Sequence, residues 1–223
     1  MKILLTIKSV TTLIIYSFII QHNSSLAVIL NIEQLKNWNP NYQTDLSLNL
    51  GFRNIDSIEA NTFSGLNNLL DLYLNSNDLT SLNDSSLFNH LTNLEFLSLS
   101  HNQLIALDNG MLFANLTNLI SLILTSNRLR SLGSNVFFNL KNLQILWLNS
   151  NRLKSLDSNV FRQMTNLKEL HLDSNQLISI NRLVFVGLND LEKVFLGFNP
   201  ISYLQSALVL ELCLANLKCE IVF

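Results

Sequence analysis

The sequence predicts an α/β solenoid, in which short coils stack into a curved array with a parallel β-sheet on the concave side and irregular or 3-10 segments on the convex side. Three observations lead to this prediction. A pattern of the form L-x-L-x-x-N-x-L-x-x-L recurs along the chain, and a second pattern, F-x-x-L-x-x-L, accompanies each full copy. The 223 residues are 48% hydrophobic and only 13% charged, so the chain has enough apolar side chains to bury an extended core.

The first pattern keeps one register over most of the chain. Its asparagines follow one another at intervals of 25, 25, 24, 24 and 24 residues. They are Asn77, Asn102, Asn127, Asn151, Asn175 and Asn199. A degenerate copy precedes them, with Leu48, Leu50, Ile55 and Ile58 at the apolar positions and Arg53 in place of the asparagine. The phenylalanines of the second pattern are Phe63, Phe88, Phe113, Phe137, Phe161 and Phe185.

Elementary physics explains why such units stack. One short unit cannot bury its own leucines, whereas neighbouring units bury them against each other. The alternating L-x-L segment is expected to form a strand, and equivalent strands of successive units pair in parallel about 4.8 Å apart. We expect the phenylalanines to stack behind the strands and to widen the outer side, which curves the array. Each asparagine carries donor and acceptor atoms and is expected to hydrogen-bond backbone groups of its own and the neighbouring coil.

Composition and motifs exclude several classes of function. The formal net charge of −2, from 14 Lys and Arg against 16 Asp and Glu, argues against a general nucleic-acid-binding protein. Two cysteines are too few for a disulfide-dense domain or a four-cysteine zinc site. The four histidines and the acids are scattered, and the common catalytic and nucleotide-binding motifs do not occur. The sequence therefore predicts no enzyme, no metal and no cofactor.

Residues 1–27 have the layout of a secretory signal peptide. Lys2 and Lys8 precede an apolar stretch over residues 13–20, and Ser25 and Ala27 occupy the −3 and −1 positions of a cleavage site. An uncleaved signal anchor or a buried terminal strand is the alternative, although the apolar stretch is short for a membrane span. Cleavage near Ala27 predicts a secreted chain without a membrane span. That chain has 12 basic and 16 acidic residues, a net charge of −4, because only two basic residues leave.

The repeats over residues 46–204, about seven in number, resemble the extracellular 24-residue class of leucine-rich repeat proteins, found in Toll-like and Slit-like ectodomains and in small leucine-rich proteoglycans. The resemblance implies a horseshoe that binds proteins. The ends depart from that class, whose members usually carry cysteine-rich caps. Residues 28–45 form an N-terminal flank without cysteine. Residues 205–223 form a C-terminal cap segment, in which residues 206–217 are expected to be a short apolar helix. A fragment of a larger membrane receptor is an alternative that these ends leave open.

The candidate binding site is the concave face, onto which the side chains around the strand leucines point. An exposed apolar stripe usually marks an interface, and Trp and Tyr are common hot-spot residues. We expect Trp147 to be the central anchor, flanked by His171 and Tyr73. The alternative is that scattered apolar side chains are ordinary on any surface. The predicted site comprises Tyr73, Phe96, Ile123, Ile145, Trp147, Glu169, His171, Asp173 and Phe195.

Three smaller features each leave two interpretations open. Arg128, Arg130, Arg152 and Lys154 lie at equivalent positions of adjacent repeats, and form either a patch for an anionic glycan or acidic partner or a solvated loop edge. Glycosylation sequons in outer loops occur at Asn83 and Asn115, while a third at Asn23 leaves with the signal; such sequons also arise by chance. Cys213 and Cys219 either form a local disulfide or stay buried thiols.

The favoured function is a secreted or cell-surface recognition module that binds a protein ligand on its concave face. A structural role in a matrix, with collagen-like or proteoglycan-like partners, is one alternative. An intracellular adaptor, whose hydrophobic N-terminus is not a signal peptide, is the other.

Overall fold

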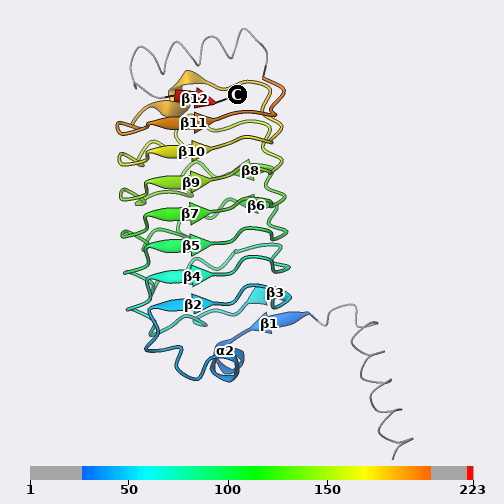
Figure 1. Cartoon of the computed structure of the whole chain (residues 1–223), viewed down its shortest axis with the longest axis vertical. Helices are drawn as coiled ribbons and strands as arrows, with labels where there is room; N and C mark the ends of the chain where they lie inside the picture. Colours follow the sequence, from blue (N-terminus) through cyan, green and yellow to red (C-terminus); the bar gives the residue numbers. More distant parts are fainter. Residues whose placement is uncertain (1–26, 202–219, 223) are drawn as a thin grey trace, which may run out of the picture.

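The computed structural model describes residues 27–201 and 220–222 and shows a solenoid of stacked coils (Figure 1). Each coil contributes one short strand to an eight-stranded parallel sheet. The strands, in their order across the sheet, are β2 (Ser47–Asn49), β4 (Asp71–Tyr73), β5 (Phe96–Ser98), β7 (Ser121–Ile123), β9 (Ile145–Trp147), β10 (Glu169–His171), β11 (Lys193–Phe195) and β12 (Glu220–Val222). This architecture confirms the predicted solenoid with a parallel sheet.

The middle residue of each repeat strand explains why the coils stack. Side chains alternate along a strand, so in a three-residue strand only the middle side chain points into the core. The register places equivalent positions side by side, for example Leu72 beside Leu97 and Leu122 beside Leu146. All four of these leucines are completely buried. One continuous apolar core therefore runs through the stack. A single coil could not bury its own leucines in this way.

A series of asparagines joins each coil to the one before it, and we call this series the asparagine ladder. The side-chain amide of Asn102 donates to the carbonyl oxygen of Leu99 in its own coil, at 3.1 Å, and to that of Leu74 in the preceding coil, at 2.9 Å. Its oxygen accepts the backbone N–H of Leu79 at 3.1 Å. The same bonds recur at Asn127, Asn151, Asn175 and Asn199, and Asn77 makes a variant of them. The predicted role of these asparagines is confirmed.

The phenylalanines of the second pattern form the back of the core. Five of them stack in sequence with centroid distances of 6.1, 6.0, 6.4 and 6.0 Å, namely Phe63, Phe88, Phe113, Phe137 and Phe161. Because parallel strands lie only about 4.8 Å apart, the back layer lengthens faster than the sheet. The stack therefore bends toward the sheet and makes its outer face concave. Phe185, the sixth phenylalanine, is also buried, in the 3-10 helix η1 (Arg182–Phe185).

The return segments of the coils are mostly turns, as predicted for the convex side. On one flank, β6 (Ala106–Leu107) and β8 (Ser131–Leu132) form a small parallel sheet.

A feature that sequence analysis missed lies just after the repeat strands. The residue directly before each ladder asparagine, or before Arg53, has a φ between 53 and 57°, in the left-handed region. These residues are Phe52, Ser76, His101, Ser126, Ser150, Ser174 and Phe198.

The N-terminal flank closes the first coil without any disulfide. β1 (Val28–Leu30) pairs in parallel with β3 (Ile55–Ile58), and α2 (Ile32–Trp38) lies beside them at the end of the stack (Figure 1). The side chain of Asn31 caps α2 by accepting the backbone N–H of Gln34 at 2.9 Å. Arg53, which replaces a ladder asparagine, places its guanidinium 4.6 Å from the ring centre of Trp38. A cation–π contact and a capped helix thus cover the end of the core.

The other end of the sheet gains a strand that sequence analysis did not predict. β12 pairs with β11, and the backbone N–H of Leu196 donates to the carbonyl oxygen of Val222 at 2.8 Å. The predicted helix over residues 206–217, both cysteines and residues 1–26 of the predicted signal peptide lie outside the described residues. Within the described residues, no helix is both long and apolar enough for a membrane span.

Candidate functional site

The outer face of the sheet consists of two columns of side chains. In each strand the first and third residues point away from the core, and the parallel register aligns them from coil to coil. The third-residue column is Asn49, Tyr73, Ser98, Ile123, Trp147, His171 and Phe195, which continues to Val222 in β12. The first-residue column is Ser47, Asp71, Phe96, Ser121, Ile145, Glu169 and Lys193. The two columns contain eight of the nine predicted site residues, and the ninth, Asp173, lies two residues after the end of β10.

Three aromatic rings of adjacent strands form a continuous stack in the third-residue column, and we call it the aromatic stack. The ring of Trp147 lies 4.7 Å from that of His171, at an interplanar angle of 38°. The ring of His171 lies 4.1 Å from that of Phe195, at 8°. Such offset contacts are favourable for aromatic pairs. Because each ring packs against the next, the contacts restrict the rotamers open to these side chains.

The apolar residues of this face are less exposed than the sequence predicted. We expected them to lie open to water, but Tyr73, Phe96, Ile123, Ile145 and Phe195 are all half-buried. The physical reason is the close strand spacing, which makes each side chain cover its neighbour in the column. Trp147 is the exception, with 37% of its surface exposed. The predicted anchor is thus the most exposed large apolar side chain of these columns, although most of its surface is covered.

A second, smaller aromatic contact lies nearer the N-terminal end of the sheet. Tyr73 and Phe96 sit on adjacent strands with their ring centres 5.0 Å apart. Beside them, the hydroxyls of Ser98 and Ser100 are 3.2 Å apart and buried. These serines and Ser121 separate the Tyr73–Phe96 pair from the aromatic stack. The face therefore carries two apolar areas rather than one unbroken stripe.

Charged groups border the aromatic stack on one side. Glu169 lies 3.5 Å from the His171 imidazole and 3.5 Å from the Lys193 ammonium. Burial lowers the pKa of His171 below its ordinary value, although the carboxylates of Glu169 and Asp173 act in the opposite direction. The imidazole in the stack is therefore mainly neutral at neutral pH. A neutral ring between two others offers an apolar contact to a partner, while Glu169 at its edge is already paired with Lys193.

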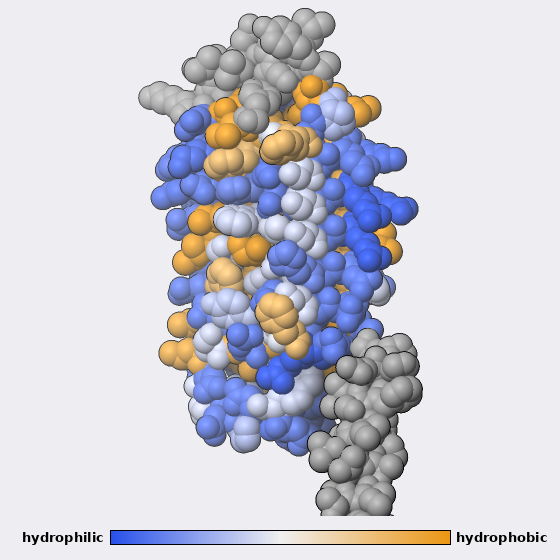
Figure 2. Space-filling model, turned by 45° about the vertical axis from the view of Figure 1, so that its right-hand side comes forward, coloured by the Kyte–Doolittle hydropathy of each residue, from blue (hydrophilic) through white to orange (hydrophobic). Residues whose placement is uncertain are grey.

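The predicted basic patch lies on the flank next to the sheet. Arg128, Arg130, Arg152 and Lys154 are all exposed. Arg152 lies beside the preceding coil, because its backbone N–H donates to the carbonyl oxygen of Leu129 at 2.9 Å. In the described part of the chain none of the four cations is within an ion-pair distance of an acid. Figure 2, which turns the flank with β6 and β8 forward, shows a largely hydrophilic surface with apolar side chains in separate spots.

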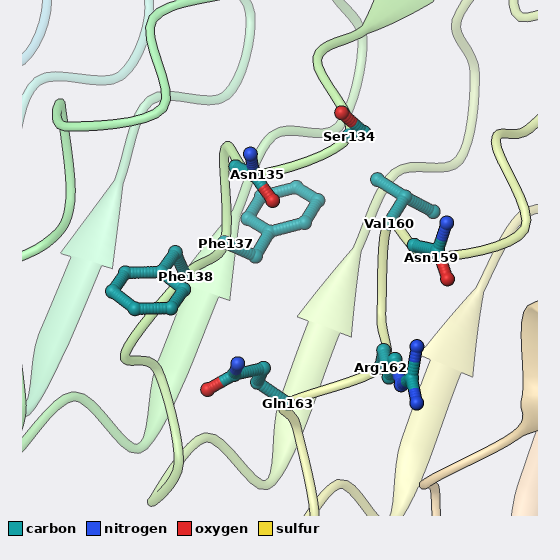
Figure 3. Close-up of a pocket in the computed structure, with 8 residues that line it drawn as sticks. All are labelled: Ser134, Asn135, Phe137, Phe138, Asn159, Val160, Arg162 and Gln163. Carbon is teal, nitrogen blue, oxygen red and sulfur yellow. The ribbon is translucent and has the colours of Figure 1, made fainter.

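A hollow on the return segments was not predicted from the sequence. It has a volume of about 470 Å³ and lies between two neighbouring coils (Figure 3). Its walls are Ser134, Asn135, Phe137, Phe138, Asn159, Val160, Arg162 and Gln163. The sequence gives one sign of this hollow. Phe138 directly follows the buried Phe137 and is itself 39% exposed. The hollow has one charged group and no pair of catalytic side chains, so it offers no evident chemistry.

The remaining predicted sites occupy the positions expected from the repeats. Asn83 and Asn115 are both exposed and lie in return segments, away from the sheet. The amide nitrogen of Asn115 donates one hydrogen bond, at 3.3 Å, to the carbonyl oxygen of Asn89, which leaves its second N–H free. Among the residues described, no three His, Cys, Asp or Glu side chains are grouped as metal ligands would be.

Comparison with known proteins identifies the repeats. The family model described as leucine rich repeat matches residues 47–104, 117–177 and 141–201. Among solved structures, a leucine-rich repeat protein of Leptospira interrogans is similar, with 32% sequence identity and a TM-score of 0.70. The similarity covers 81% of this chain but only 43% of that protein's chain. The search of curated proteins gave no match.

Proposed function

The chain belongs to the leucine-rich repeat family, and on this premise we propose that it is a secreted or cell-surface recognition module that binds a protein ligand through its concave sheet. The family typically mediates protein–protein interaction, and its repeat fold is a typical non-enzymatic scaffold. The observation that carries the proposal is the aromatic stack of Trp147, His171 and Phe195 on adjacent strands. No other described helix or strand lies over this face of the sheet (Figure 1).

The repeat constraints make the composition of this face informative. Stacking requires apolar residues inside and asparagines at the bends, but it places no such requirement on the outward side chains. Polar residues would satisfy those positions at no cost to the core, as Asn49 and Ser121 do. A cluster of aromatic rings at positions that face water therefore needs another explanation, and binding is the usual one.

Secretion is supported by the signal-like residues 1–27 and by the exposed sequons. We propose that the chain enters the secretory pathway and that glycans on Asn83 and Asn115 occupy the return segments, so that the sheet stays accessible. Expression in a secreting eukaryotic cell tests this: the chain is expected in the medium, with a mobility shift on glycosidase treatment. Retention inside the cell at full length would contradict secretion.

Trp147 provides the test of binding. Wild-type protein and two variants, Trp147→Ala and Phe52→Ala, are immobilised and exposed to extracellular proteins of the source organism. Phe52 is the matched control, because it is an aromatic residue with 81% exposure that lies outside the two columns. A specific ligand is expected to bind wild type and Phe52→Ala equally and to lose about 30-fold in affinity, roughly 2 kcal/mol, with Trp147→Ala. Undiminished binding by Trp147→Ala would refute the assignment.

The basic patch supports a second, auxiliary contact with an anionic glycan. Four exposed cations, none of them in an ion pair among the described residues, form a positive field on a chain that is otherwise slightly acidic. Retention on a heparin column is expected to fall with the double variant Arg128→Glu/Arg152→Glu. It should fall much less with Lys141→Glu/Lys168→Glu, which makes the same change in net charge at exposed positions elsewhere. Equal behaviour of the two double variants would remove the patch from the proposal.

A further inference from the structure

The first strand of the described chain begins at the predicted cleavage site. β1 starts at Val28, and Ala27 before it is exposed. At the other end of β1, the carbonyl oxygen of the buried Leu30 accepts the backbone N–H of Glu59 at 2.9 Å and the hydroxyl of Thr62 at 3.2 Å. The chain is therefore anchored to the fold from Val28 onward, with residue 27 outside it.

A carboxylate is placed directly at the nitrogen of Val28. The Asp56 Oδ2 atom lies 2.6 Å from the Val28 backbone nitrogen, which donates to it. The position of Asp56 follows from an irregularity in the pairing of β1 with β3. Val28 is opposite Ile55 and Ile29 is opposite Ser57, so Asp56 has no partner residue of its own. Bulges of this kind redirect a side chain, and here the redirected side chain meets the start of the strand.

We propose that the Ala27–Val28 bond is the processing site of this chain and that Asp56 is the binding site for the α-ammonium group that processing creates. The proposal rests on the secretion proposed above. Hydrolysis by a signal peptidase consumes one water molecule, leaves a carboxylate on Ala27 and gives Val28 an amine, which is protonated. Since Val28 already donates to Asp56, the new charge forms where its counter-charge already lies.

The exchange of an amide for an ammonium strengthens this contact. Hydrogen bonds between two charged groups are shorter and stronger than those with one charge or none. An ammonium has three donors, so the two N–H groups that Asp56 does not accept can face water on the side that Ala27 leaves open. In a repeat protein the end units have only one neighbour, and their cohesion depends on such capping contacts. Processing would thus stabilise the N-terminal cap of the mature protein.

The processing site is tested by mass spectrometry and N-terminal sequencing of the full chain expressed in a secreting cell. A mature chain that begins at Val28 is expected. A secreted chain that begins at another residue would overturn this inference while leaving secretion intact. Retention of residues 1–27 would overturn both, and the binding test with Trp147 is independent of either result.

The role of Asp56 is tested by a thermodynamic cycle. Mature protein with a free Val28 amine is compared with the same protein acetylated at that amine, each with Asp56 and with Asp56→Asn. The free amine is expected to raise the melting temperature by about 2 °C or more only when Asp56 is present. Glu59→Gln, an exposed acid-to-amide control nearby, should preserve the effect of the free amine. An equal effect of acetylation with Asp56 and with Asp56→Asn would overturn the assigned contact.

Discussion

Removal of one rung of the asparagine ladder is expected to destabilise the whole stack. Asn127 is 7% exposed and makes its hydrogen bonds in the middle of the array. Its amide donates to the carbonyl oxygens of Leu99 at 2.9 Å and Leu124 at 3.1 Å, and its oxygen accepts the N–H of Leu104 at 3.1 Å. Asn127→Ala leaves the N–H of Leu104 without a partner in a buried place. The carbonyl oxygens of Leu99 and Leu124 each lose one of two donors, because Leu99 still accepts from Asn102 and Leu124 still accepts from Asn151.

The magnitude follows from the cost of unpaired groups. A buried donor or acceptor that loses its partner costs about 1–3 kcal/mol. The N–H of Leu104 has the full cost because it loses its only acceptor, whereas each carbonyl keeps a second amide donor and loses only the smaller net contribution of one hydrogen bond. We expect a total of about 2–4 kcal/mol, which corresponds to a fall in melting temperature of about 4–16 °C for a domain of this size.

Thermal and urea unfolding followed by circular dichroism measure this loss. Asn118→Ala is the matched control, because Asn118 is an exposed asparagine with one bond, at 3.0 Å, to the carbonyl oxygen of Thr92. Asn127→Asp keeps the shape but presents a carboxylate to two carbonyl oxygens, so it should be at least as harmful as Asn127→Ala at neutral pH. A melting temperature within about 2 °C of wild type for either Asn127 variant would refute the reasoning, since the contacts would then carry almost no stability.

Two further predictions concern backbone space and pH. Gly187→Ala should cost about 2 kcal/mol or more beyond Gly65→Ala, because both glycines have a positive φ but a Cβ at Gly187 would overlap the backbone oxygen of Arg162, whereas the space around Gly65 is open. Urea midpoints for the two variants measure this, and equal losses would contradict it. For His171, burial lowers the folded-state pKa below its ordinary value, so the unfolded chain binds the proton more readily. Its contribution to stability is therefore present above about pH 6.5 and decreases as the pH falls below that value. His171→Gln should flatten the fall in stability between about pH 7.5 and 5, and an unchanged pH profile would contradict the assignment.

The parts of the fold that repeat could be predicted from the sequence, because each position was observed several times. The strands, the buried leucines, the stacked phenylalanines and the bonds of Asn102 all follow from one pattern in register. The left-handed residues escaped prediction because six of the seven are serine or phenylalanine, which carry no sign of that conformation, and the seventh is His101. Glycine, which would have signalled it, is absent from those positions in every coil.

The two ends could not be predicted, because each feature there occurs once. The contact between Arg53 and Trp38 joins a repeat position to a residue of the flank, and no periodicity links the two. β12 is a three-residue strand, and it is recognised only by its pairing with β11 in the structure. Likewise, Asp56 looks like one more polar residue on an outer strand until the irregular register with Val28 is seen.

The candidate site was predicted in position but not in character, and the difference sharpens the functional argument. Sequence alone implied a row of separate exposed side chains, for which an ordinary surface was a fair alternative. In the structure, Trp147, His171 and Phe195 lie in direct contact on three adjacent strands, and Trp147 is the most exposed of the three. A preformed stack loses little conformational entropy on binding, which is the condition under which few side chains provide most of the affinity. The loss of affinity in Trp147→Ala should therefore exceed that in Tyr73→Ala, whose ring belongs to the smaller and less exposed pair with Phe96.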